Sequence, residues 1–517
     1  MADTTAASGE MKRSLTLTGV TANAMALIAP GAFLWTTFQV QAALNRGNTS
    51  TAPDMWTGLL FSLILAFLTA YSYAELARIY PDAGTGSTYY FAEAALLDKA
   101  KPQHRRWARF AKLSVGWISH LYYWIYPGIM VAFTATLFGY IWSAVFNNTL
   151  SYYWLGVVAV AFAVLTGYIA YRGITGSTMT SIMILVIQIV SLVAVSVWFI
   201  AYRLGHAHMG YELANAKAVI IPHSFINLLY QSTIAILLLV GFESITALGA
   251  EAIRPEKDIK RGVLISLAIQ GGLCYLLQYF AANYAIGKGT ISSGTGRHAL
   301  TGYAAAAQDS APIGTMLKTT IGSGGTTISV FVALTVLLAL IGTMLACLNT
   351  AVRVTYSMAR DKEMPSILGL LHGRFATPHG GIWILVAVSA ALGIFGANPN
   401  QVDNLSQITL ASNTGTFLVY GFTCVIAVVA FASRHDRHSV KHYLVPGVGA
   451  LMNVAELLGV VYIAVNATGT SPGNAYKALG AVVLWCLIGV AWVLFNPSHR
   501  GRKVIHDPGP RETVAAT

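Results

Sequence analysis

The segment Pro222–Ile253, PHSFINLLYQSTIAILLLVGFESITALGAEAI, decides how this chain folds. A membrane-spanning helix needs about 20 apolar residues, and this mainly apolar segment is longer than that. Glu243 interrupts the apolar run, within the tetrapeptide Gly241-Phe242-Glu243-Ser244. A carboxylate near the bilayer centre costs roughly 2.5 to 3.5 kcal/mol, so Glu243 is by default a candidate functional residue. The alternative is an acid that is merely protonated or paired inside the helix bundle.

The composition of the whole chain is that of a polytopic membrane protein. Of its 517 residues, 55% are hydrophobic and 10% are charged, and the mean hydropathy is +0.60. About a quarter of the residues of a soluble domain are charged. The net charge of +12 is dispersed over many short segments, which does not favour nucleic-acid binding. The four cysteines lie in apolar runs without paired spacing, so neither a disulfide framework nor a metal site is predicted.

Apolar runs separated by turn and charge clusters predict twelve membrane-spanning helices. No cleavable signal peptide is expected, because Lys12 and Arg13 lead directly into a first span that is too long for a signal sequence. The longest outer connection, 288–324, is predicted to be a loop with a short helix. The predicted spans are 16–44, 56–78, 112–146, 153–171, 178–202, 222–253, 263–287, 325–358, 381–398, 404–431, 443–466 and 476–495.

The distribution of Lys and Arg predicts the orientation of these spans. Seven of the 32 basic residues fall in the loops on one side, and the other 25 lie in the alternating segments and the two tails. Basic residues are enriched on the cytoplasmic side of membrane proteins. We therefore expect cytoplasmic tails at 1–15 and 497–517, in a multi-pass protein of a cell membrane, typically the bacterial inner membrane.

The first and sixth predicted spans both look interrupted. As one helix, 16–44 would extend about 43 Å, which is longer than a straight crossing needs. Its midpoint is Ala29-Pro30-Gly31-Ala32, where the proline lacks an N–H donor and the glycine tolerates unusual backbone angles. A plain proline kink is the alternative. Interrupted segments in corresponding positions of two halves are typical of inverted-repeat transporters, so the pair predicts a secondary transporter.

Three short motifs follow predicted spans two, six and eight, each on the side that the basic residues assign to the cytoplasm. They are Tyr73-Ala74-Glu75-Leu76-Ala77 with Tyr80-Pro81-Asp82-Ala83-Gly84, Ala250-Glu251 with Arg254-Pro255-Glu256-Lys257-Asp258, and Asn349, Arg353 and Tyr356 with Met358-Ala359-Arg360-Asp361. With these motifs the chain resembles the amino acid–polyamine–organocation superfamily over about residues 14–430.

The resemblance implies an all-α fold of the leucine-transporter type. Such a fold has two inverted five-helix repeats, with helices one and six broken, and two further C-terminal helices. On this sequence it implies a first repeat at 16–204, a second, inverted repeat at 205–431, and helices eleven and twelve at 432–496.

The resemblance also implies a substrate site on the backbone of the two broken helices. The implied residues are Ala29, Pro30, Gly31, Ala32, Phe33, Gly241, Phe242, Glu243 and Ser244, with Asn413 and Thr414 of helix ten as secondary candidates. The Gly-Ser-Gly run usual in helix one is replaced here, which removes a hydroxyl and an N–H donor and counts against capture of a carboxylate. Gly-Phe-Glu-Ser resembles the Gly-x-Glu-Ser of arginine/agmatine and polyamine exchangers, where the glutamate takes part in amine recognition or proton coupling.

Aromatic residues and polar residues inside the spans are further candidates. Phe33, Trp35 and Phe242 are placed to attract an organic cation, whereas most of Trp117, Tyr122, Tyr123, Trp124 and Tyr126 are interpreted as packing or interfacial residues. Thr335 and Thr343 are candidate sodium ligands, but protonation of Glu243 is the simpler coupling hypothesis. Interhelical hydrogen bonding is the interpretation for Gln188, Asn283, Asn349, Gln407 and Glu456.

These observations predict a permease for amino acids or small organic amines that works by alternating access, coupled to protons or by exchange. An exchanger of polyamines or cationic amino acids, and a sensor that binds without transporting, are the alternatives. The histidines lack the paired spacing of an intramembrane metal site, so no enzyme activity, cofactor or metal is expected. The expected partners are the small-molecule substrate, the lipid bilayer and protons, and nucleic acid is not among them.

Overall fold

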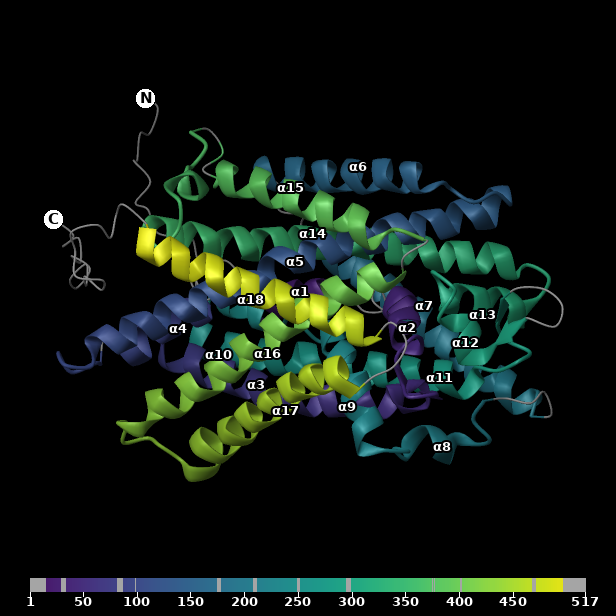
Figure 1. The fold of residues 1–517 in the computed structure, drawn as a ribbon, viewed down its shortest axis with the longest axis horizontal. Coiled ribbons are helices and arrows are strands. Elements are labelled where there is room, and N and C mark those ends of the chain that lie inside the picture. Colours follow the sequence, from purple (N-terminus) through teal and green to yellow (C-terminus); the bar gives the residue numbers. More distant parts are fainter. Residues whose placement is uncertain are drawn as a thin grey trace.

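The structure, a computed structural model, is almost entirely helical (Figure 1). It describes residues 15–28, 34–80, 87–97, 99–173, 178–207, 212–248, 252–293, 299–373, 375, 377–399, 402–466 and 471–495. Within these ranges, eleven helices are long and apolar enough to cross a membrane. Most of them lie along the long axis of the molecule, as Figure 1 shows.

The long helices agree with the predicted spans to within a few residues at most ends. They are α3 (Met55–Ile79), α5 (Arg105–Phe146), α6 (Tyr152–Tyr171), α7 (Thr178–Gly205), α14 (Gly325–Arg360), α15 (His379–Gly396), α16 (Val402–Ala432), α17 (Val445–Asn466) and α18 (Ser471–Phe495). A further span is made of α10 (Pro255–Leu267), the π-helical segment η6 (Ala268–Tyr275) and α11 (Leu276–Ala285). A second π-helical segment, η9 (Val440–Leu444), leads into α17.

The first predicted span consists of two short helices. α1 (Leu17–Ile28) and α2 (Leu34–Ala42) occupy its two halves, and residues 29–33 lie outside the described part of the chain. Neither half has the length of a bilayer crossing, which is why eleven helices rather than the predicted twelve meet the length criterion.

The sixth predicted span is interrupted at the predicted place. α9 (Phe225–Ala235) passes into a 3-10 turn, η4 (Ile236–Leu238), and the chain resumes as the 3-10 helix η5 (Phe242–Leu248). Gly241, between the two, has φ +125°, a conformation that side-chain-bearing residues rarely adopt. The glycine therefore ends the helical hydrogen bonding in the middle of the membrane-spanning segment.

The connections contain short elements. β1 (Asn45–Arg46) pairs antiparallel with β2 (Thr49–Ser50), and β3 (Ser292–Ser293) with β4 (Leu300–Thr301). The other short elements are η1 (Ala52–Asp54), α4 (Thr88–Ala92), η3 (Glu93–Leu97), α8 (Ala216–Ile220), α12 (Gly302–Ala306), α13 (Pro312–Ile321) and η8 (Ser366–Gly369). The connection 288–324 thus holds a hairpin and two helices, which is more structure than the predicted loop with a short helix.

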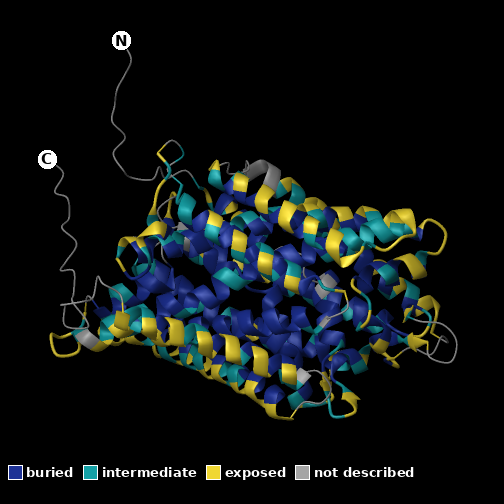
Figure 2. Ribbon diagram, turned by 45° about the horizontal axis from the view of Figure 1, so that its top comes forward, coloured by how far each residue is buried: buried dark blue, intermediate teal, exposed yellow. Residues whose placement is uncertain are grey.

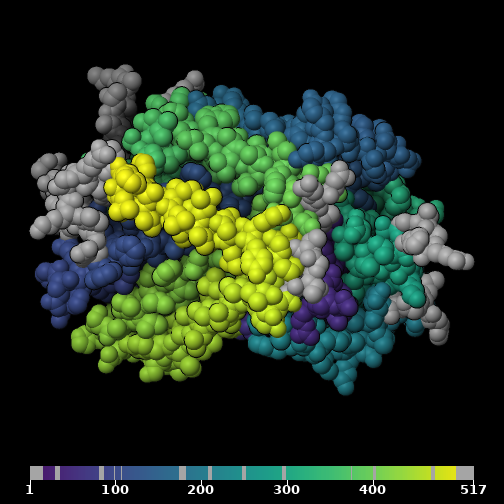
Figure 3. Space-filling model, in the orientation of Figure 1, coloured from purple at the N-terminus to yellow at the C-terminus, as the bar shows by residue number. Residues whose placement is uncertain are grey.

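The outer helices expose apolar side chains, as expected for contact with lipid. Val157 on α6, Leu451 on α17 and Leu487 on α18 are all exposed, and Figure 2 shows exposed residues along the rims of the bundle around a buried interior. α18 lies across the surface of the molecule (Figure 3). It is attached to α5 by Trp117 and Trp485, whose rings stack at 5.0 Å and whose indole N–H groups donate to each other's backbone carbonyls over 2.9 Å.

Candidate functional site

The Glu243 side chain is completely buried where η5 meets α5 and α16. Tyr122 on α5 donates its hydroxyl hydrogen to Glu243 Oε1 over 2.5 Å, and Tyr420 on α16 donates to Oε2 over 2.8 Å. The backbone N–H of Gly241 donates to Oε2 over 3.0 Å. A carboxylate is a pure acceptor, so three donors directed at its two oxygens suit the ionised form.

No basic side chain neutralises Glu243 among the residues that the structure describes. The ion pairs there join Lys, Arg and His to other acids, and Glu243 takes part in none of them. A buried charge without an opposite charge is costly even when it is hydrogen-bonded. A single positive charge on a bound ligand could therefore balance the charge of the Glu243 carboxylate.

Aromatic rings surround this carboxylate. Tyr73 on α3 lies edge-on to Phe242 and to Tyr420, with ring centroids 6.1 and 6.0 Å apart, and Phe242 lies 5.3 Å from Tyr420. The hydroxyl of Tyr73 is hydrogen-bonded to Thr88 Oγ1 over 2.6 Å, which fixes the ring. Aromatic faces attract organic cations by up to about 2 kcal/mol when water is excluded.

Local hydrogen bonds shape the backbone that carries Glu243. Ser244 donates both its N–H, over 3.1 Å, and its hydroxyl, over 2.6 Å, to the carbonyl of Gly241. Thr246 donates its hydroxyl to the carbonyl of Glu243 over 2.6 Å. A Cβ at Gly241 would lie 2.8 Å from Leu27 Cδ2, so α1 approaches the break closely. Ser244 thus serves the turn that positions Glu243.

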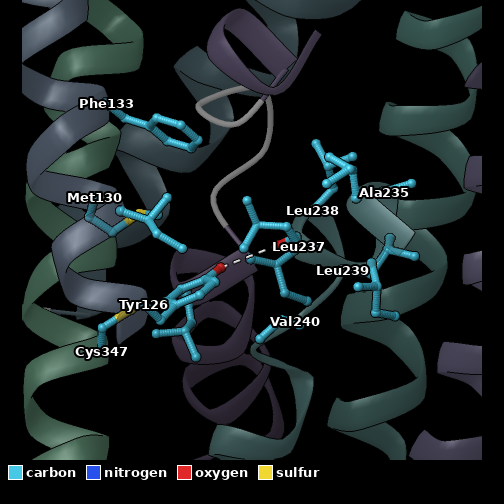
Figure 4. Close-up of a cluster of buried hydrophobic side chains, with 14 of the residues drawn as sticks. Tyr126, Met130, Phe133, Ala235, Leu237, Leu238, Leu239, Val240 and Cys347 are labelled. Atoms are coloured by element: carbon cyan, nitrogen blue, oxygen red, sulfur yellow. Dashed lines mark hydrogen bonds between the residues drawn. The ribbon is translucent and has the colours of Figure 1, made fainter. Parts of the chain in front are cut away.

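Side chains from other helices donate hydrogen bonds to backbone carbonyls beside the break in the sixth span. Asn413 on α16 donates from Nδ2 to the carbonyls of Thr233, over 2.7 Å, and Ile234, over 3.4 Å. Tyr126 donates to the carbonyl of Leu237 over 3.4 Å, and Figure 4 shows this contact in a cluster of apolar side chains. Irregular backbone survives inside a membrane only with such partners.

The C-terminal end of α1 is held in the same way. Gln270 on η6 donates to the carbonyl of Met25 over 2.7 Å, and Tyr275 donates to that of Ile28 over 3.1 Å. Thr343 on α14, a candidate sodium ligand by sequence, donates to the carbonyl of Ala26 over 3.0 Å. Side chains of neighbouring helices therefore donate hydrogen bonds to three backbone carbonyls in the last turn of α1.

The structure brings together only part of the predicted substrate site. Gly241, Phe242, Glu243 and Ser244 lie together, whereas the predicted residues Ala29, Pro30, Gly31, Ala32 and Phe33 are outside the described residues. Of the secondary candidates, Asn413 binds the carbonyls above, and Thr414 donates to the Leu410 carbonyl of its own helix over 2.7 Å. Trp35 packs edge-on against Tyr140, with centroids 5.9 Å apart.

Sequence reasoning did not identify the two tyrosines that bind Glu243. Tyr122 belongs to a cluster interpreted mainly as packing or interfacial, and Tyr420 was not singled out. A tyrosine hydroxyl buried inside a span needs a polar partner, and this is the signal that points to both. The sequence alone does not show which acid either hydroxyl binds, because that depends on how the helices pack.

A cavity of about 530 Å³ opens near the C-terminal end of α5 and is lined by Tyr140, Asp309 and Lys318 among others. Its lining does not include Glu243 or either of the tyrosines that bind it. Glu243, which is completely buried, is therefore not part of the wall of this cavity.

The three sequence motifs contribute hydrogen bonds between helices. Glu75 accepts hydrogen bonds from Arg78 and Lys260, and Asp361 accepts from Tyr89 over 2.8 Å and from Lys112 over 3.2 Å. Burial, together with the carboxylates of Asp361 and Glu363, raises the pKa of Tyr89 well above its usual value, so its hydroxyl remains a donor. These contacts therefore join α3 to α10, and the C-terminal end of α14 to α4 and α5.

Replacing Tyr420 with Phe should lower the unfolding temperature of the purified protein, because a hydrogen bond to a charged group contributes about 1.5–3 kcal/mol. The same change in a Glu243→Gln background should cost less, since a bond to a neutral amide is weaker. Thermal unfolding of the four variants in one detergent measures both losses. Equal losses in the two backgrounds would show that Tyr420 does not stabilise a charged Glu243.

Comparison with known proteins gives matches along almost the whole chain. The family model described as amino acid permease matches residues 14–494. A low-affinity putrescine importer of Escherichia coli (strain K12) is 24% identical over 490 residues, which cover 92% of this chain and 94% of the importer. A branched-chain amino acid permease of Bacillus subtilis (strain 168) is 22% identical over 508 residues, covering 94% and 92%. A methylthioribose transporter of the same organism is 22% identical over 481 residues, covering 87% and 88%.

Proposed function

This chain belongs to the amino acid permease family, transporters rather than enzymes, and we propose that it carries amino acids or small organic amines by alternating access. In this proposal, residues 16–204 and 205–431 are two inverted repeats that place the α1–α2 and α9–η5 breaks in corresponding positions. Both termini are cytoplasmic, as the distribution of Lys and Arg favours. The protein works as a multi-pass permease of a cell membrane.

The proposal rests mainly on the burial of the Glu243 carboxylate without an opposite charge beside it. Its carboxylate receives three hydrogen bonds, is completely buried, and has no ion-pair partner among the described side chains. A substrate ammonium group supplies the missing positive charge and can donate further hydrogen bonds. The rings of Tyr73, Phe242 and Tyr420 provide an aromatic wall for such a cation.

An ammonium site at Glu243 suits the substrates named for two relatives. Putrescine and branched-chain amino acids both carry an ammonium group, but only the amino acids carry a carboxylate. The Ala29–Ala32 segment lacks the Gly-Ser-Gly run usual for carboxylate capture. That difference favours amines without a carboxylate over amino acids. The narrower form of the proposal is an exchanger of polyamines, with cationic amino acids, which do carry a carboxylate, as the alternative substrates.

Proton coupling is the second role that we propose for Glu243. When the ammonium group leaves, a proton can replace it as the positive charge on the carboxylate. The two roles are compatible, because ammonium and proton would occupy Glu243 in turn. Release of the substrate on one side would then favour return of a protonated carrier.

A ligand panel tests the proposal. Putrescine, agmatine, arginine and leucine, each carrying an ammonium group, are compared with methylthioribose, which lacks one, in thermal-shift assays on the purified protein. A ligand at 100 times its dissociation constant stabilises the folded state by about 2.7 kcal/mol. We expect stabilisation by one or more of the amines and none by methylthioribose. Stabilisation by methylthioribose alone would contradict an ammonium site.

Counterflow of the labelled hit in proteoliposomes then distinguishes a carrier from a sensor. A carrier exchanges external label for internal unlabelled substrate, whereas a sensor binds without moving its ligand. We expect accumulation of label. Binding without counterflow would favour the sensor alternative.

A further inference from the structure

A second buried acid, Glu456, lies on α17, outside the site described above. α17 packs against α3, α9 and α16 along one face, and Figure 1 shows it beside α3 and α9. The buried residues of this face include Gly449, Asn453, Glu456 and Ile463. Glu456 has no solvent exposure and stands near the middle of the packed face.

Neither oxygen of Glu456 has a hydrogen-bond partner among the described residues. The Ser232 hydroxyl on α9 stands close to Glu456, and it also lies 2.9 Å from the carbonyl of Leu229, so two acceptors share its single hydrogen. Asn453, three residues earlier on α17, already donates from Nδ2 to Thr69 Oγ1, over 3.3 Å, and to the carbonyl of Gly449, over 2.8 Å. A carboxylate here would therefore have at most one shared hydroxyl donor and no counter-charge among the described residues.

A neutral carboxylic acid fits the same surroundings. Its O–H group is a donor, and the Oδ1 atom of Asn453 is a buried acceptor without a partner in the described chain. The contrast with Glu243 is chemical: three donors converge on Glu243, whereas Glu456 has one shared hydroxyl and, one helical turn earlier on the same buried face of α17, the unpartnered acceptor of Asn453. Burial without compensation favours the neutral form of an acid.

Other titratable groups on the neighbouring elements do not change this assignment. They are Tyr71, Tyr73, Glu75 and Arg78 on α3, Tyr230 on α9, Asp403, Tyr420 and Cys424 on α16, Tyr462 on α17, Tyr476, Lys477 and Cys486 on α18, and Lys441, His442 and Tyr443 on η9. Arg78 and His442 are placed against Glu75. None of these groups forms an ion pair with Glu456 within the described part of the chain.

We propose that Glu456 is a second proton-binding site of this protein, separate from Glu243, where a bound proton allows α17 to pack against α9 and α3. Binding forms an O–H bond on the carboxylate, with the proton taken from water, and release breaks that bond. Loss of the proton leaves an uncompensated charge in the packed face, which favours separation of the helices. The ligand is a proton, and the inference does not depend on the identity of the substrate.

Infrared spectroscopy of the purified protein tests this directly. A protonated carboxylic acid has a C=O stretching band that a carboxylate lacks and that shifts in heavy water. At neutral pH we expect this band in the wild type, and in Glu456→Gln we expect its intensity to fall by the contribution of one carboxylic acid. Glu256→Gln, which removes an exposed acid of the same type, should leave the intensity of the band unchanged. An unchanged band in Glu456→Gln would overturn the proposal.

Thermal unfolding across pH gives a second, independent measurement. The wild type should lose stability as pH rises, because the unfolded carboxyl ionises freely while the folded one holds its proton, and Glu456→Gln should remove that part of the loss. If Glu456→Gln does not fold, Glu456→Met, neutral and of similar length, takes its place. A sodium-dependent stabilisation that disappears in either variant would identify a cation site and overturn proton binding. Neither assay contains substrate, so these outcomes are independent of the ligand panel.

Discussion

Glutamine in place of Glu243 is expected to weaken binding of a cationic amine by at least about 30-fold. The change keeps the size of the side chain and an oxygen that Tyr122 can bind, but it removes the negative charge. Removing one member of a buried ion pair costs about 2–5 kcal/mol, and each 1.4 kcal/mol changes affinity tenfold. Equilibrium binding of radiolabelled amine to the purified variant measures the change.

The matched control for this variant is Glu256→Gln, which changes an exposed acid on α10 in the same way. Its affinity should equal that of the wild type. If Glu243→Gln loses affinity because it no longer recognises the amine, and not because it is less stable, both variants should unfold close to the wild-type temperature. An affinity of Glu243→Gln within about threefold of the wild type, for a folded protein, would exclude a counter-ion role for Glu243.

Alanine at Gly241 is expected to give the largest loss of transport outside Glu243 itself. Gly241 has φ +125°, where a Cβ is strained by about 1–3 kcal/mol, and that Cβ would meet Leu27 Cδ2 at 2.8 Å. Both effects would displace the backbone N–H that binds Glu243. Initial rates of counterflow should fall at least about tenfold, which corresponds to 1.4 kcal/mol of lost stabilisation, and the unfolding temperature should fall as well.

A double-mutant cycle separates the two causes. In a Leu27→Ala background the close approaches to Leu27 Cδ2 and Cγ are removed, whereas the 3.1 Å approach to Cβ and the backbone strain remain. Gly241→Ala should therefore lower the transport rate less there than in the wild-type background, but still measurably. Gly272→Ala is the control, because a Cβ there meets no atom within 4 Å. An equal cost of Gly241→Ala in both backgrounds would mean that contact with α1 does not constrain the break.

The membrane-spanning helices could be predicted well because each contains a long run of apolar residues that can be recognised from the sequence alone. The prediction for 56–78 falls inside α3, and that for 325–358 inside α14. The starts of α5 and α10 were placed too late, at 112 and 263 instead of Arg105 and Pro255. Both helices begin with charged residues, and a helix that continues beyond the bilayer no longer has an apolar signature.

The family could also be predicted, since the three short motifs led to the family that matches residues 14–494. Glu243 stood out because a single acid in an apolar run is detectable without any knowledge of packing. Tyr122, Tyr420 and Asn413 were harder to interpret, because their roles depend on which helices meet at the break. One polar residue on a helix does not reveal the partner it faces across the bundle.

The most direct measurement is a cryo-electron microscopy structure with the tightest-binding amine of the panel. We expect the ammonium nitrogen within about 3 Å of a Glu243 carboxylate oxygen, the length of a charge-assisted hydrogen bond, with the carbon chain against Tyr73 and Phe242. An ammonium nitrogen bound elsewhere, while Glu243 still holds only Tyr122, Tyr420 and the Gly241 N–H, would contradict this expectation.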